Sequence, residues 1–430
     1  MSCTSQQSGE CSASGQIGSF VDDALGGTLA RDHQSRAVFF RGQFTRTYVA
    51  YMDHHFNARI TFYDHEGEQW AFPTRIDTCI RGRFPDGHNV PNLFVTKDGF
   101  IHIFYGSHNH SFKYARSREP ENIGEWETGL QVGKDGTYPY FAGTDGGDLL
   151  VFYRYGPTGG YNNPFLAVQH SSDYGRSWED LRQLATFEEG CKLYGNNALY
   201  DSHRGRVHLI LNVPIEFERR LESSAWKQYY CQYEPDSGGL FSITGNRIGP
   251  VAEEEDFRRN NGRLGGREIV DMFLHGRVLL FLFRTEENRL EFGRWDGAEI
   301  ECTAIPAHLM EHGVPEQITL GTDDGGLINL YGIHSEGAEA GDLMTWKSED
   351  GGANWQGPEC LLRHPVPGND LQAPNLVMAY QSSGPRLLVG ERPGEWPEDV
   401  ARTPRNHYDN PGRRDKRLYA VTADGETVQT

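Results

Sequence analysis

One strand-and-turn phrase recurs along the whole chain, and this repetition limits the possible folds more than any other feature. Each copy is a strand followed by a turn that carries glycine, and in most copies a large apolar residue follows three positions later. The mean spacing is about 60 residues, with the glycines at Gly67, Gly124, Gly175, Gly238, Gly297, Gly352 and Gly425. A period of this size is typical of an array of similar β-sheet units.

Two further strand-like segments precede every turn. The first unit reads AVFF (37–40), TYVAYMD (47–53) and ARITFYD (58–64), and the later units keep this order. The middle segments are mostly apolar runs, as expected for strands that are buried on both faces. No long stretch has apolar residues at helical spacing. The sequence therefore predicts an all-β fold, a seven-bladed β-propeller of four-stranded antiparallel blades.

Two of the phrases are complete Asp boxes, with the pattern S-x-D-x-G-x-x-W. They start at Ser171 and Ser348 and end at Trp178 and Trp355. The Asp side chain can cap backbone N–H groups of the hairpin, Gly supplies the turn, and Trp packs between sheets. This pattern predicts a structural device rather than a substrate contact.

The repeats also indicate the domain organisation. Residues 1–30 are small and polar and form an N-terminal tail, whereas 31–430 form a single seven-bladed propeller. The last phrase ends at Val428, which leaves too few residues for an outer strand of the last blade. Because an unpaired sheet edge is a liability, we expect a segment of the tail, residues 16–21, to supply that strand and close the ring.

The charge and the apolar pattern exclude several classes of function. The net charge is -19, which argues against nucleic acid and against an anionic membrane surface as partners. No apolar run is long enough to span a membrane, and no signal peptide is visible. Seven scattered cysteines show neither C-x-x-C spacing nor a disulfide framework. These features favour a cytoplasmic location, unless the chain is the mature form of a secreted protein.

Functional side chains are expected where the chain leads into the first strand of each blade. In a propeller these first strands line the central channel, and the segments before them form one mouth of it. The alternative to a functional cluster is that these side chains are polar only because the channel mouth is exposed to solvent. The positions carry an unusual number of His, Tyr, Arg and Asn side chains, which include His33, Arg36, Asn89, Tyr138, Tyr194, Arg263 and Arg267.

The second and third units are the richest in such residues. His88 and His108 lie near the ends of neighbouring antiparallel strands, so they can meet at one rim, and His110 has the same parity as His108. Three histidines can bind zinc, but no Cys, Asp or Glu stands at matching spacing, so no metal is predicted.

The strand LLVFYRYG (149–156) follows in the third unit. In it, Tyr153 and Tyr155 share one face and Arg154 points the other way. We expect Tyr153 or Tyr155 to approach His108, although either can instead be a core aromatic.

Three stretches carry a specific resemblance: TYVAYMDHHFNARITFYDHEGEQW, DGHNVPNLFVTKDGFIHIFYGSHNHSFKYARS, and TYPYF followed by LLVFYRYG. They resemble the BNR-type propeller family that includes the ulvan lyases, with a sister group that removes rhamnose from glucuronate in arabinogalactan and gum arabic. The similarity covers roughly residues 30–240. The family's lyases use two histidines and a tyrosine, and His88, His108 and Tyr153 match them in type and spacing. An arginine of the ulvan lyases is absent here, where Gln169 or His170 stands instead.

The resemblance implies a polysaccharide lyase that cleaves a rhamnose-(1,4)-uronate linkage by β-elimination, on ulvan or on an arabinogalactan or gum. The partner would be an acidic polysaccharide or oligosaccharide, and no cofactor is required. Tyr153 can act as base, acid or both, and His88 and His108 as base or carboxylate partners. Arg154, Arg263 and Arg267 are candidate cations for the carboxylate.

Two alternatives stay open. A sialidase-like exo-glycosidase also uses Asp-box propellers, but no Arg-Ile-Pro signature stands near the start of this chain. A non-catalytic carbohydrate-binding propeller is the other, because resemblance carries fold more reliably than activity.

Overall fold

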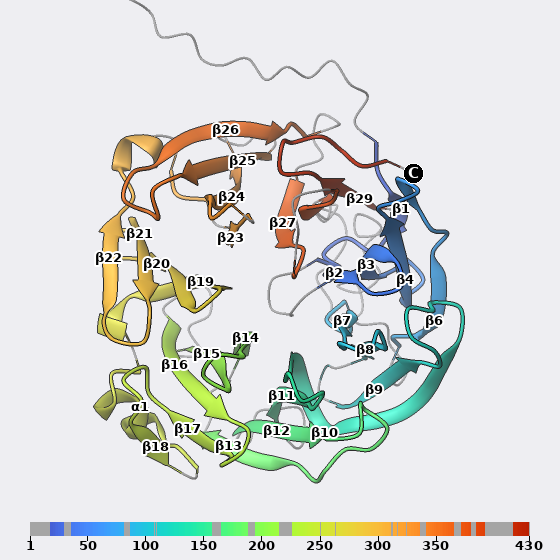
Figure 1. Cartoon of the computed structure of the whole chain (residues 1–430), viewed down its shortest axis with the longest axis horizontal. Coiled ribbons are helices and arrows are strands. Elements are labelled where there is room, and N and C mark those ends of the chain that lie inside the picture. The colour runs from blue at the N-terminus through green and yellow to red at the C-terminus, as the bar shows by residue number, and fades with distance from the viewer. Residues whose placement is uncertain are drawn as a thin grey trace, which may run out of the picture.

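Antiparallel β-strands make up almost all regular structure of the protein, and they are arranged around a central axis (Figure 1). The computed structural model describes residues 18–29, 36–80, 87–106, 108, 110–156, 165–187, 194–214, 226–249, 251–262, 264–310, 313–315, 317–323, 325–335, 341–364, 371–379, 384–391 and 416–429. In these ranges the helical elements are short, namely α1 (Glu254–Arg259), η1 (Leu264–Gly266) and η2 (Ala307–Met310). None of the described helices has the length and apolar character needed to cross a membrane.

The first repeat and the two that follow it form two sheets. The first sheet contains β2 (Ala37–Arg41), β3 (Thr45–Met52), β4 (Asn57–Asp64), β5 (Gln69–Trp70) and β6 (Thr74–Thr78). The second contains β7 (Asn92–Val95), β8 (Ile101–Tyr105), β9 (His110–Ser117), β10 (Trp126–Gly143), β11 (Leu149–Tyr155), β12 (Phe165–Ser171) and β13 (Arg182–Thr186).

The remaining repeats form one sheet each. The fourth contains β14 (Tyr194–Asp201), β15 (Arg206–Pro214), β16 (Trp226–Glu234), β17 (Gly239–Phe241) and β18 (Arg247–Gly249). The fifth contains β19 (Glu268–His275), β20 (Val278–Arg284), β21 (Leu290–Trp295) and β22 (Ile300–Ala304). The sixth contains β23 (Ile318–Thr322), β24 (Ile328–Ser335), β25 (Gly341–Ser348) and β26 (Gln356–Leu362). The last contains β27 (Leu371–Leu376), β28 (Leu387–Glu391), β29 (Lys416–Val421) and β1 (Val21–Ala24).

The all-β propeller architecture is confirmed, but the prediction of seven separate four-stranded blades is corrected. The described strands form six sheets, of which one has seven strands. The reason is β10, an 18-residue strand whose first half pairs with β9 and whose last part pairs with β11. Hydrogen bonding therefore runs without a break from the second repeat into the third.

The sheets stand side by side because their innermost strands contact one another around the axis (Figure 1). β2 contacts β7, β7 contacts β10, and the series continues through β14, β19, β23 and β27. A bridge between Val38 and Met378 joins the first repeat to the last. The inner strands thus surround one central channel.

The ring is closed by pairing between the two ends of the chain. β1 pairs with β29, with Val21 opposite Leu418, and the Phe20 N–H donates to the Leu418 carbonyl at 3.0 Å. The Phe20 ring stacks on Trp70 with 4.2 Å between ring centroids. The closing strand lies at Val21–Ala24 rather than at the expected 16–21, of which Gln16 and Ile17 lie outside the described residues. The division into a tail, 1–30, and one propeller, 31–430, stays a prediction.

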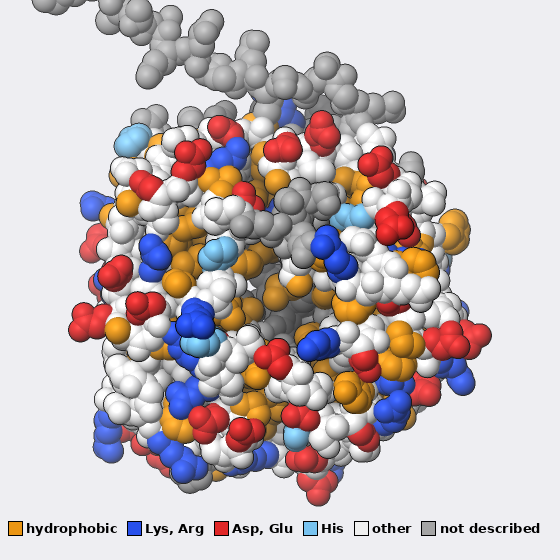
Figure 2. Space-filling model, in the orientation of Figure 1, with side chains coloured by type: hydrophobic (Ala, Val, Ile, Leu, Met, Phe, Trp, Pro, Cys, Tyr) orange, Lys and Arg blue, Asp and Glu red, His pale blue; other side chains and the backbone are white. Residues whose placement is uncertain are grey.

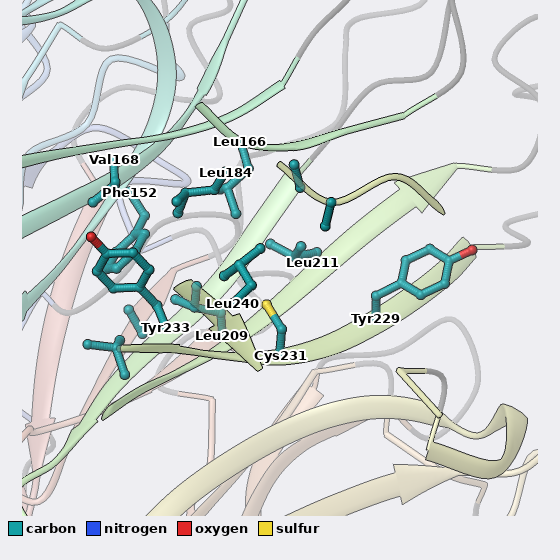
Figure 3. Close-up of a cluster of buried hydrophobic side chains, with 14 of the residues drawn as sticks. Phe152, Leu166, Val168, Leu184, Leu209, Leu211, Tyr229, Cys231, Tyr233 and Leu240 are labelled. Carbon is teal, nitrogen blue, oxygen red and sulfur yellow. The ribbon is translucent and has the colours of Figure 1, made fainter. Parts of the chain in front are cut away.

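Apolar side chains fill the spaces between neighbouring sheets. Between the third and fourth repeats, Phe152 and Leu166 lie together with Leu209, Leu211 and Leu240 from the next sheet (Figure 3). All five side chains are fully buried. Burial of this kind stabilises the ring because each sheet covers the apolar face of its neighbour.

Both Asp boxes are structural, as predicted. In the first, Ser171 Oγ accepts a hydrogen bond from the Gly175 N–H at 2.8 Å, and Asp173 accepts one from the Ser177 N–H at 2.8 Å. Partial burial opposes ionisation of Asp173, but hydrogen bonds from Ser177 outweigh it and lower the pKa to about 2. The box therefore holds its hairpin through a carboxylate.

Gly175 offers a test of this packing. Its φ is 77°, and a Cβ there would overlap the Tyr114 hydroxyl, so Gly175→Ala adds a clash to backbone strain. We expect it to lower the free energy of unfolding by about 2–4 kcal/mol in urea denaturation. Gly205→Ala is the matched control, because its φ is 64° and nothing lies within 4 Å of an added Cβ. It should cost about 1 kcal/mol. Equal costs for the two variants would contradict the packing argument.

Candidate functional site

Several innermost strands carry a β-bulge, near the beginning of β14 and β19 and in the last third of β10. The register shifts between Thr137 and Tyr140 in β10, and between Ile269 and Asp271 in β19. β14 has the same irregularity directly after Tyr194 and Gly195. A bulge re-aims the side chains around it, and such bulges are frequent beside active sites. Figure 2 shows a face of the molecule that is hollowed at its centre, with Lys, Arg and His side chains around the hollow.

The two predicted histidines of the second repeat lie side by side. The ring centroids of His88 and His108 are 4.5 Å apart, and both side chains are half-buried. Asn89 holds them in place: its Oδ1 accepts a hydrogen bond from the His108 N–H at 3.0 Å, and its carbonyl accepts one from the Gly106 N–H at 3.1 Å. Asn89 is itself 2% exposed, which makes it a positioning residue rather than a substrate contact.

A second group of side chains continues from this pair. The Tyr138 ring lies 6.0 Å from His108 and 5.2 Å from Tyr194, measured between centroids. The Arg154 guanidinium lies over both tyrosine rings, 5.2 Å from Tyr138 and 5.1 Å from Tyr194. Tyr138 has a φ of 54°, in the left-handed region, which is costly for a residue with a side chain. The bulge in β10 and this backbone conformation together set the direction of the Tyr138 ring.

Tyr153 lies on the opposite face of β11 from Arg154, as the alternation predicted. Its hydroxyl donates to Gln169 Oε1 at 2.9 Å, and its ring packs against Phe112. The same Oε1 accepts the Gly133 N–H at 2.8 Å. The side chain is fully buried, and burial raises the pKa of Tyr153 well above its usual range. The Tyr153 hydroxyl is therefore neutral and donates its hydrogen bond to the Gln169 side-chain amide.

The tyrosine ring that lies beside His108 among the described residues is that of Tyr138, whereas we expected Tyr153 or Tyr155 there. Tyr155 instead stacks on Phe165, with 4.5 Å between ring centroids. Gln169 was noted in the sequence only as the residue that stands where relatives have arginine. Its spacing of 16 residues from Tyr153 on a paired strand is the signal that brings the two together.

Arg36 has a structural place instead of the predicted substrate contact. It is fully buried, and its guanidinium donates to the Thr28 carbonyl at 3.0 Å, to Asn92 Oδ1 at 2.6 Å and to the Pro91 carbonyl. Burial lowers the pKa of Arg36 to about 9, so the group is still charged at neutral pH. It ties the first repeat to the second.

Of the other predicted residues, two are described and two lie outside the described residues. Arg267 is half-buried and paired with Glu291 at 2.6 Å, and this hydrogen bond raises the pKa of Arg267. His110 is exposed at the start of β9. His33 and Arg263 are outside the described residues. Over the part of the chain that the structure describes, no three His, Cys, Asp or Glu side chains gather in a metal-binding arrangement.

Comparison with known proteins supports the resemblance drawn from the sequence. The profile of a BNR repeat-containing family member matches residues 46–251. An ulvan lyase from Nonlabens ulvanivorans is 23% identical over 394 residues, which cover 81% of each chain. Another relative, "Ulvan Lyase-PL25" from Pseudoalteromonas sp. (strain PLSV), is 29% identical over 183 residues, 38% of this chain and 36% of its own.

A solved structure has the same fold over nearly its whole length. It is described as a polysaccharide lyase of a new family, PL25 ulvan lyase, with a TM-score of 0.73 at 18% identity, over 96% of this chain and 97% of that one. A second structure of that lyase is bound to -[GlcA(1-4)Rha3S]-, with a TM-score of 0.72. The lectin BP39L from Burkholderia pseudomallei has a TM-score of 0.50 at 12% identity, over 92% of this chain and 94% of its own. The chain thus has the β-propeller fold of lyases and lectins that act on or bind carbohydrate.

Replacement of Arg36 separates its structural place from a substrate contact. Arg36→Met leaves buried carbonyls without a donor, so we expect the free energy of unfolding to fall by about 3 kcal/mol in urea denaturation. Arg41→Met is the control, because Arg41 is exposed at the end of β2, the strand that Arg36 directly precedes, and it should change stability by less than about 0.5 kcal/mol. An Arg36→Met protein of unchanged stability would restore the substrate-binding interpretation.

Proposed function

We propose that this protein is a polysaccharide lyase that cleaves a rhamnose-(1,4)-uronate linkage by β-elimination, on ulvan or on an arabinogalactan or gum-type polysaccharide. The observation that carries the proposal is the close pair of His88 and His108, whose rings are tilted by 32°, beside Tyr138. An ulvan lyase that aligns with 81% of this chain, and an ulvan lyase structure of the same fold, support the same function. An acidic polysaccharide or oligosaccharide is the partner that this function requires.

β-Elimination requires a base, an acid and a group that compensates negative charge, and the site has candidate side chains for each role. A base removes the proton at C5 of the uronate, the C4–O bond breaks, a C4–C5 double bond forms, and an acid gives a proton to the departing oxygen. The negative charge that develops beside the carboxylate must be compensated. An imidazole can serve as base when neutral and as carboxylate partner when protonated, so the two histidines can divide these tasks. Water is not consumed in any of these steps.

Two tyrosines are candidates for proton transfer. Tyr153 matches the tyrosine of the related lyases in its spacing along the sequence, and Tyr138 lies beside His108 in the structure. Tyr153 can join the reaction only if its hydroxyl leaves Gln169, because that amide oxygen already accepts both Tyr153 and the Gly133 N–H. Tyr138 needs no such exchange, since its ring already lies beside His108. We keep Tyr153 as the proposed proton-transfer residue and Tyr138 as the competing one. Arg154 lies against the Tyr138 ring, with its guanidinium 5.2 Å from the ring centroid.

Single substitutions test these assignments. His88→Ala, His108→Ala and Tyr153→Phe should each lower turnover on ulvan or gum arabic by about a hundredfold, typical for loss of an acid–base group. Progress is followed through the ultraviolet absorbance of the unsaturated uronate. Tyr138→Phe is the comparison: if it loses activity while Tyr153→Phe keeps it, Tyr138 transfers the proton. Urea denaturation of each variant shows whether the fold is retained.

The carboxylate is a second test, because only a carboxylate or its equivalent acidifies the C5 proton. We expect a uronate oligosaccharide to be cleaved and its carboxyl-reduced twin to be left intact. Binding should weaken with added salt, because salt screens the attraction between the substrate carboxylate and the local cations that must hold it against an overall charge of -19. Equal rates on both substrates would contradict elimination.

The two alternatives give different results in the same assay. A sialidase-like glycosidase would release sugar without the absorbance of a new double bond. A binding propeller, for which the lectin of similar fold is a precedent, would bind either oligosaccharide without converting it.

A further inference from the structure

The row of ring side chains continues beyond the histidine pair to two tyrosines. His88, His108, Tyr138 and Tyr194 follow one another, with centroid separations of 4.5, 6.0 and 5.2 Å and angles of 31–32° between successive ring planes. His88 lies shortly before β7 and His108 shortly before β9, whereas Tyr138 lies within β10 and Tyr194 begins β14, so the row runs across three repeats. This length exceeds what one scissile bond needs.

The members of the row differ in accessibility. Tyr138 is 5% exposed and Arg154 is 3% exposed, so neither presents much surface to a ligand. Tyr194 is half-buried, as are the two histidines. The accessible surfaces are therefore the histidine pair and the Tyr194 ring, with Tyr138 between them.

Arg154 fixes the orientation of Tyr194. Its guanidinium lies 5.1 Å from the Tyr194 ring centre and 5.2 Å from that of Tyr138, a range in which cation–π attraction operates. Because both tyrosine rings contact the same planar guanidinium, Arg154 restrains the orientation of both. Arg154 itself is the penultimate residue of β11, a buried strand that is a rigid support.

We infer that Tyr194 is the stacking residue of a second sugar subsite, next to the histidine pair, and that Arg154 is a positioning residue for its ring. This inference rests on the proposed lyase function and names how a longer chain is held. The apolar C–H face of a sugar ring packs on an aromatic ring, and such a ring is worth most when it is already oriented. The subsite would take a sugar unit of the acidic polysaccharide beside the one that reacts.

The test compares substrates of two lengths. The short one is a rhamnose-glucuronate disaccharide, with one scissile linkage, and the long one is the polysaccharide that the wild-type protein cleaves. Tyr194→Ala should raise KM for the long substrate by about tenfold, with kcat changed by less than about threefold, and leave the short substrate nearly unaffected. Tyr194→Phe keeps the ring and should behave as wild type. Tyr200→Ala, on the far part of the same strand, is the control for ring removal in β14.

Arg154 is tested through a double-mutant cycle. Arg154→Lys keeps the charge but loses the planar group that covers both rings, and it should raise KM for the long substrate alone. In a Tyr194→Ala background the same change should add nothing, because the ring that Arg154 positions is gone. An undiminished effect in that background would show that Arg154 binds substrate directly and overturn its positioning role.

Failure of the inference is separable from failure of the proposed function. If wild type cleaves and Tyr194→Ala has the wild-type dependence on chain length, the subsite is refuted and the lyase stands. If wild type cleaves nothing, the affinity for the same two carbohydrates, measured by calorimetry, replaces KM. A length-dependent loss of affinity in Tyr194→Ala then still supports the subsite, and equal affinities refute it.

Discussion

The whole arrangement depends on hydrogen bonding between the two ends of the chain. β1 adds to the edge of β29, and the Phe20 ring covers Trp70, whose indole Nε1 donates to the Val428 carbonyl at 3.0 Å. Without β1 the last sheet would expose an unpaired edge beside the first sheet. The closed ring fixes the innermost strands around the channel, and the candidate site is assembled from these strands and from the segments that lead into β7 and β9. No single repeat contains it.

Within this frame, small departures from regular strand geometry direct the site. The bulge in β10 and the left-handed backbone of Tyr138 turn its ring toward His108, while Asn89 ties the His108 backbone to the segment that leads into β7. Strain of this kind persists only where surrounding packing imposes it. The site therefore draws its geometry from the rigid sheets, which suits a reaction in which base, acid and carboxylate partner must stand in fixed relation.

The repeat and the strand alternation were readable from the sequence because they depend on local patterns. The segments 37–40, 47–53 and 58–64 fall on β2, β3 and β4, and the opposite orientation of Tyr153 and Arg154 follows from the period of a strand. That the second and third repeats share one continuous sheet through β10 could not be predicted from the sequence. Gly133 and Gly136 resemble turn signals, yet they lie inside β10, where a Cβ would overlap the Phe112 ring. The burial of Arg36 and the bond between Tyr153 and Gln169 likewise depend on contacts between distant segments.

The central claim is that the glycosidic bond breaks by elimination, and the source of the oxygen atoms in the products tests it most directly. The polysaccharide is cleaved in water enriched in heavy oxygen, and the fragments are examined by mass spectrometry. Elimination breaks the C4–O bond, leaves the one bridging oxygen on C1 of the rhamnose and takes none from water, so we predict unlabelled fragments with an unsaturated uronate at one end. One labelled oxygen per cleaved bond, with no double bond, would establish hydrolysis and contradict the account.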